Sequence, residues 1–93
     1  MIVSFANEET KLVFLGKPSK KFPAKIHERA VKKLKMLNAA KRPEDLLIPP
    51  SNRLHGLKGD RKGQYSISID LQYRIVFNWS DVGASDVQIL DYH

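Results

Sequence analysis

Residues 65–79 read YSISIDLQYRIVFNW, and this stretch decides the fold. Large apolar side chains alternate with smaller or polar ones over 65–70 and again over 73–79, which is the period of a β-strand with one buried face. Leu71 and Gln72 separate the two runs and supply a tight turn. The stretch therefore predicts an antiparallel hairpin with one aromatic face.

Further strands are expected on both sides of this hairpin. A turn over 80–85 and a last strand over 86–92 follow it. Short strands are also expected at 2–5 and at 54–57. The sheet should therefore be mainly antiparallel, with four or five strands.

Two helices are expected in the N-terminal half. Asn7 suits the N-cap of the first helix, which Gly16 should end. The second helix should run from about Pro23 to Ala40. Its apolar side chains fall on one arc of the helical wheel and its charged ones on the other, and His27 on the apolar arc is expected to be a packed residue.

A short helical turn through Leu47 and an extended linker at Pro49 and Pro50 should join the second helix to the sheet. The second helix is the amphipathic element able to cover the aromatic face. We therefore predict a single α+β domain over 1–93, compact, with N-terminal helices packed on the sheet.

The charge is unevenly distributed along the chain. The net charge is +6, but residues 1–62 hold 15 Lys and Arg against 6 Asp and Glu, whereas residues 63–93 hold 1 against 4. Clustered cations attract phosphates through counterion release, so the basic half predicts a nucleic-acid-binding surface. A lysine-rich helix that serves only solubility is the alternative.

Several classes of protein are excluded by composition. The chain has no cysteine, which removes disulfides and thiolate metal sites, and no apolar run long enough to span a membrane. Its first residues do not resemble a signal peptide, so a cytoplasmic protein is expected. No zinc-protease, serine-hydrolase or P-loop motif occurs, and no cofactor or metal is expected.

Cleavage of RNA without a metal requires a base for the 2′-hydroxyl, cations around the phosphorus and a proton donor for the leaving oxygen. His55 and His93 are the candidate proton-transfer pair, because imidazole titrates near neutral pH. Arg74 should lie on the polar face of its strand, where a guanidinium suits phosphate. Alternatively, Arg74 could pair with Asp70 or Asp86, and His55 could be an ordinary loop residue.

The chain ends in an acid, a phenol and an imidazole: Asp91, Tyr92 and His93. Asp91 and Tyr92 could position RNA, orient an imidazole or carry a proton. Strand alternation places Asp91 and His93 on one side and Tyr92 on the other. One catalytic cluster therefore requires the last residues to curl or bulge.

Two basic loops are candidates for contact with RNA. Lys20 and Lys21 lie in the loop before the second helix. Lys58 and Arg61 lie in a turn near two glycines, where main-chain N–H groups and cations could bind phosphate.

The run NRLHGLKGDRKGQYSISIDLQYRIVFNW (52–79) and the ending ILDYH (89–93) resemble a HigB-type toxin of the RelE superfamily. The resemblance also covers the opening IVSF and the phrase KLKMLNAA. It implies a RelE-like microbial ribonuclease fold and an endoribonuclease, or mRNA interferase, that cuts messenger RNA in the ribosomal A site. It further implies neutralisation by a helix-turn-helix antitoxin of HigA type, which alone would contact operator DNA.

The resemblance assigns catalysis to His55, Arg74 and the terminal 91–93 group, and contact with a base to Gln72. There are departures: Ser68 stands where many relatives have Arg, and some relatives have an acid in place of His55. The general base therefore stays open between the two histidines. A non-catalytic protein that blocks translation by occupying the ribosome is the rival function.

Overall fold

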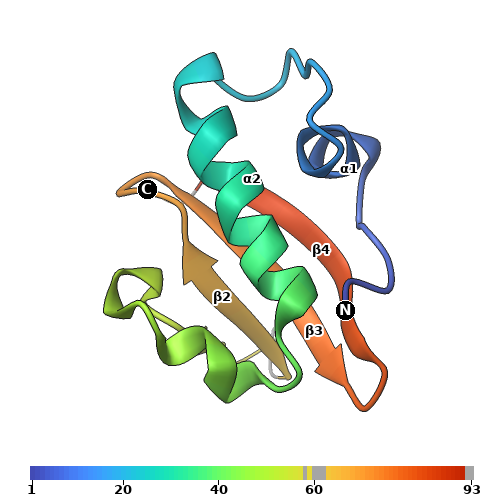
Figure 1. Ribbon diagram of the computed structural model, residues 1–93, viewed down its shortest axis with the longest axis vertical. Helices are drawn as coiled ribbons and strands as arrows, with labels where there is room; N and C mark the ends of the chain where they lie inside the picture. The colour runs from blue at the N-terminus through green and yellow to red at the C-terminus, as the bar shows by residue number, and fades with distance from the viewer. Residues whose placement is uncertain (58, 60–62, 92–93) are drawn as a thin grey trace.

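The computed structural model describes residues 1–57, 59 and 63–91, and its fold is α+β as predicted (Figure 1). Within these residues, four antiparallel strands lie in the order β1-β2-β3-β4. No helix in the described ranges is long and apolar enough to span a membrane. The elements are α1 (Glu8–Phe14), α2 (Ala24–Ala39), the 3₁₀ turns η1 (Pro43–Leu47) and η2 (Pro50–Asn52), and the strands β1 (His55–Gly56), β2 (Gln64–Ser68), β3 (Tyr73–Ser80) and β4 (Gly83–Asp91).

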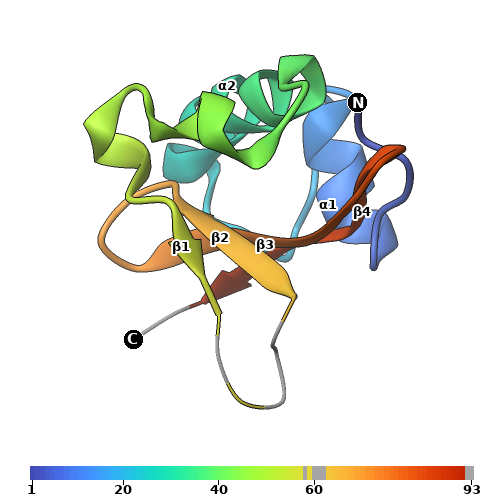
Figure 2. The same ribbon diagram turned by 90° about the horizontal axis from the view of Figure 1, so that it is seen from below.

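The core lies between one face of the sheet and the two helices, which cover the same side (Figure 2). Ile75 and Phe77 of β3 are completely buried, as are Leu34 and Leu37 of α2. Figure 1 shows α2 crossing over the sheet. The apolar face predicted over 65–79 is therefore confirmed as the core face, but the opposite face is not simply exposed, because Ser66, Ser68 and Val76 on it are also buried.

The prediction of a strand at 2–5 is wrong, because these residues do not form a regular strand. Ile2 and Phe5 form only isolated parallel bridges, to Ala84 and Val87 of β4. Between these bridges Asp86 has φ 50° at a register shift of β4, and its amide donates to the Ser4 hydroxyl (2.9 Å). This bulge interrupts the main-chain ladder, so residues 1–6 only line the edge of β4.

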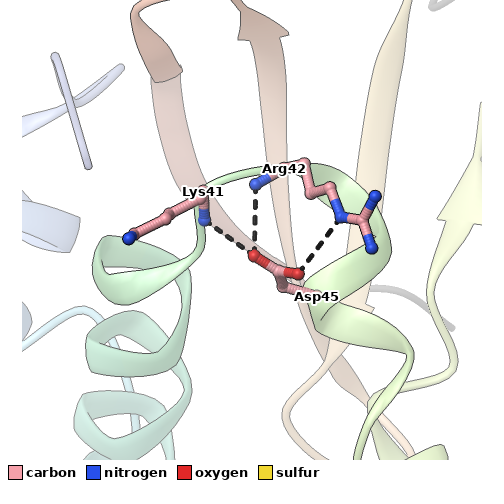
Figure 3. A network of polar contacts seen from close by, with 3 residues as sticks. All are labelled: Lys41, Arg42 and Asp45. Atoms are coloured by element: carbon pink, nitrogen blue, oxygen red, sulfur yellow. Dashed lines mark hydrogen bonds and ion pairs between the residues drawn. The ribbon is translucent and has the colours of Figure 1, made fainter.

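The connection from α2 to the sheet differs in part from the prediction. Pro49 is extended as expected, but Pro50 begins η2, because proline suits the first position of a helical turn. The preceding turn, η1, is capped by Asp45, whose Oδ2 accepts from the amides of Lys41 (2.9 Å) and Arg42 (3.3 Å) (Figure 3).

A buried polar pair ties α2 to this connection. Lys33 is only 7 % exposed and donates through Nζ to Oδ1 of the fully buried Asn52. The side-chain Nδ2 of Asn52 donates in turn to the Leu46 carbonyl oxygen (3.1 Å). Burial lowers the pKa of Lys33 from its ordinary value of 10.5, and the neighbouring charges of Lys32 and Arg29 lower it further.

Replacing Gly83 by Ala should destabilise the fold strongly. Gly83 has φ 141°, and an added Cβ would collide with the main-chain oxygen of Met1. We expect Gly83→Ala to lower the free energy of unfolding by about 2 kcal/mol or more. Gly16→Ala is the matched control, because Gly16 also has a positive φ (74°) but has no atom within 4 Å of the added Cβ. Urea unfolding that gives equal losses for both variants would contradict the close approach of Met1 to β4.

Lys33 should make the protein more stable at alkaline pH. Its lowered pKa means that the folded state releases the proton before the unfolded state does, so the free energy of unfolding rises with pH from the folded pKa up to 10.5. The rise should be about 1.4 kcal/mol for each tenfold difference in proton affinity between the two states. Urea unfolding at stepwise pH should show this rise in the wild type and in Lys35→Met, an exposed position on the same helix, but not in Lys33→Met.

Candidate active site

A row of side chains crosses the face of the sheet that points away from the helices. The register pairs His55 with Ser66, Ser66 with Val76, and Val76 with Gln88. Directly paired residues point to the same face, and Arg74 joins them because it lies two positions from Val76. The register therefore places the two candidates His55 and Arg74 on one face of the sheet, opposite the face of the buried Ile75 and Phe77.

The guanidinium of Arg74 lies beside His55. Its Nε donates to the Ser66 hydroxyl (3.0 Å), and its Nη2 donates to the Arg53 carbonyl oxygen (2.7 Å). Nη2 also lies 3.4 Å from Nδ1 of His55. A cation and an exposed imidazole therefore meet at one point of the surface.

The Arg53 carbonyl oxygen also fixes the tautomer of His55. It lies 2.6 Å from Nδ1 of the imidazole, and a carbonyl oxygen can only accept a hydrogen bond. Nδ1 must therefore carry a proton, and in the neutral ring the lone pair is on Nε2. This is the form in which Nε2 can take a proton from a hydroxyl group.

The two carboxylates that could have paired with Arg74 bond elsewhere. Asp70 accepts from the amides of Gln72 (2.8 Å) and Tyr73 (2.7 Å), which shapes the β2–β3 turn. Asp86 accepts from the Asn78 side chain (3.1 Å). The hydrogen bonds that Arg74 makes with Ser66 and Arg53 hold its guanidinium at the site.

Asp91 and Gln72 form a second polar group at the β2–β3 turn. Gln72 donates to the Asp91 carboxylate (3.0 Å). Asp91 is paired with the buried Tyr73, so its position in the register is on the helix side of the sheet, opposite Arg74. The strands alone therefore do not bring Asp91 to the face of His55. Four further candidates, Lys58, Arg61, Tyr92 and His93, lie outside the described residues.

A basic groove of about 1400 Å³ opens between α2, η2 and the β2–β3 turn. Gln72 and Arg53 line it on the side of the sheet, and four exposed cations line it on α2: Lys25, Arg29, Lys32 and Lys35. Lys20 and Lys21 are exposed just before α2 but do not line the groove, and Lys21 Nζ lies 5.9 Å from the centre of the Phe22 ring.

Arg53 is the candidate that sequence reasoning missed. Its main chain is in the left-handed region (φ 47°, ψ 54°), and the residue types of the segment Asn-Arg-Leu-His do not predict that conformation for arginine. In the described ranges, no group of three His, Asp or Glu side chains is placed to hold a metal ion. His27 makes a hydrogen bond with the Phe22 carbonyl oxygen (3.0 Å), as expected for a packed histidine.

Known proteins resemble this chain over most or all of its length. Residues 4–93 match the family model of the RelE-like toxin of the type II toxin-antitoxin system HigB. Toxin HigB-1 of Vibrio cholerae serotype O1 is 42% identical over 71 residues, which cover 76% of this chain and 74% of that protein. Endoribonuclease HigB of Proteus vulgaris is 33% identical over 93 residues, 100% of both chains. The chain therefore belongs to the RelE-like HigB toxins of type II toxin-antitoxin systems.

Proposed function

We propose that this toxin is an endoribonuclease that cleaves messenger RNA in the ribosomal A site by acid-base chemistry of its own side chains. The observation that carries the proposal is the meeting of His55 and Arg74 at the Arg53 carbonyl oxygen, which lies 2.6 Å from Nδ1 of His55 and 2.7 Å from Nη2 of Arg74. The likeness to a relative named an endoribonuclease supports the same class of reaction.

The reaction is an in-line attack of a ribose 2′-oxygen on the neighbouring phosphorus. A base takes the 2′ proton, the P–O5′ bond breaks, and an acid returns a proton to the 5′-oxygen, which leaves a 2′,3′-cyclic phosphate and a 5′-hydroxyl. Arg74 would stabilise the charge that develops on the phosphoryl oxygens. Either His55 or His93 would be the base, with Asp91 or Tyr92 assisting.

The basic groove would hold the RNA backbone of the ribosome. Its four α2 cations and Gln72 line the same groove, and Gln72 could contact a base of the substrate. In-line attack requires a strained RNA conformation that a domain of 93 residues has little surface to impose. The ribosome would supply that conformation, which explains why the toxin should depend on it.

The inhibitor we propose is a helix-turn-helix antitoxin of HigA type. Type II systems pair the toxin with a protein antitoxin, and this toxin has no helix pair of the kind that reads DNA within its described residues. Operator DNA would then be contacted through the antitoxin.

Substitutions at the site should abolish cleavage without abolishing ribosome binding. Removal of a positioned proton-transfer group typically costs about 10²- to 10⁴-fold. We therefore expect His55→Gln and His93→Ala to reduce transcript cleavage and growth arrest to that degree if each transfers a proton. His27→Gln is the matched control, since it changes a histidine that makes a hydrogen bond with a main-chain oxygen outside the site.

Primer extension on transcripts from expressing cells is the measurement. Discrete new 5′ ends with the wild type and His27→Gln, and their disappearance in the site variants, support the nuclease. Arrested translation with intact wild-type transcripts would instead establish the rival, a protein that only occupies the ribosome.

Removing two groove cations should weaken ribosome binding in a salt-dependent way. For each cation–phosphate pair removed, the slope of log affinity against log salt should fall by about 0.7 to 0.9. We expect this for Lys32→Ala/Lys35→Ala in ribosome pelleting across a salt series. The control pair Lys11→Ala/Lys41→Ala removes the same charge outside the groove lining, and an equal change there would refute a specific docking role for the groove.

A further inference from the structure

The main chain at Arg53 has an unusual conformation next to the site. Its φ of 47° and ψ of 54° put a residue with a full side chain in the left-handed region. That region costs an L-residue about 1 to 2 kcal/mol, so surrounding contacts must impose it. The Arg53 side chain is exposed, so the contacts that impose the conformation belong to the main chain and to its neighbours.

Those contacts come from the turn before Arg53. The Arg53 amide donates to the Pro50 carbonyl oxygen (3.0 Å), and the Asn52 amide donates to that of Pro49 (2.9 Å). The Asn52 side chain is anchored in the core, where it accepts from Lys33 and donates to Leu46. The direction of the Arg53 carbonyl is therefore determined by buried bonds that reach α2.

We infer that Arg53 is a positioning residue that acts through its main-chain carbonyl oxygen. The two lone pairs of this oxygen accept one hydrogen bond from His55 Nδ1 (2.6 Å) and one from Arg74 Nη2 (2.7 Å). The first bond keeps Nε2 of His55 available as a proton acceptor, and the second holds the guanidinium beside the imidazole. This inference rests on the proposed function, in which both side chains act on RNA.

A pair of substitutions separates the main chain of Arg53 from its side chain. Arg53→Asn and Arg53→Val both remove the guanidinium, but asparagine tolerates the left-handed region and a β-branched residue does not. Only Arg53→Val should turn the carbonyl away from the site. Any difference between the two variants therefore reports on the carbonyl and not on the missing charge.

The direct readout is the tautomer of His55, measured by ¹⁵N NMR of the imidazole at a pH where the ring is neutral. We expect the Nδ1–H form in the wild type and in Arg53→Asn, and a shift toward the Nε2–H form in Arg53→Val. Cleavage kinetics on programmed ribosomes should show kcat about 10²-fold lower for Arg53→Val than for Arg53→Asn, with similar KM for both. Near-ultraviolet circular dichroism checks that both variants are folded.

The inference is overturned if Arg53→Val keeps the Nδ1–H tautomer, or if Arg53→Asn loses it. If Arg53→Val does not fold, Arg53→Asn alone still decides through its tautomer. The tautomer is read without RNA, so this test is separate from the nuclease assay. If His55→Gln cleaved normally, the proposed catalytic role of His55 would be refuted. The hydrogen bond between His55 and the Arg53 carbonyl oxygen would still be tested separately by the tautomer measurement.

Discussion

The packing of α2 on the apolar face of β3 is the constraint on which the rest of the structure depends. Ile75 and Phe77 are completely buried beneath the helix, so the sheet has only one face left for chemistry. Within the described residues no helix packs on that other face, so polar side chains can occupy it. The site can therefore be built on regular strands, which hold His55 and Arg74 more rigidly than loops would.

The same helix serves three purposes at three angles around its axis. Its apolar arc forms the core, its outer arc lines the basic groove, and Lys33 lies between the two. A buried ammonium group needs an acceptor, and here Asn52 supplies it from the turn that leads to the site. The Lys33–Asn52 contact thus joins the core and the groove to the turn that carries the candidate site.

Most of the fold could be predicted because its signals are local. The period-2 pattern over 65–79 predicted β2 and β3, and the amphipathic pattern of residues 23–40 predicted α2 to within one residue at each end. The edge beside β4 was not predicted, because it depends on the register shift near Asp86, whose φ is 50°, and strand alternation alone does not show where such a shift falls.

The sequence predicted which residues belong to the candidate site but not how they are arranged. Sequence alone named His55 and Arg74, but it could not show that they meet, since their separation depends on the register of three strands. Arg53 was missed because the contacts that bring it into the site are made by its main-chain oxygen, which a residue-type pattern does not reveal. The opposite placement of Asp91 was indicated by strand alternation and follows from its pairing with Tyr73.

The segment along β4 has a consequence for how the molecule behaves at high concentration. Main-chain groups of Met1, Val3, Ser4 and Ala6 bond to β4, and the buried Thr10 hydroxyl accepts the Ile89 amide (3.0 Å). Unpaired amides along an outer strand are a template on which other chains can stack and aggregate. Here a strand from another molecule would first have to displace residues 1–6 before it could pair with β4, so this edge of the sheet is protected against aggregation.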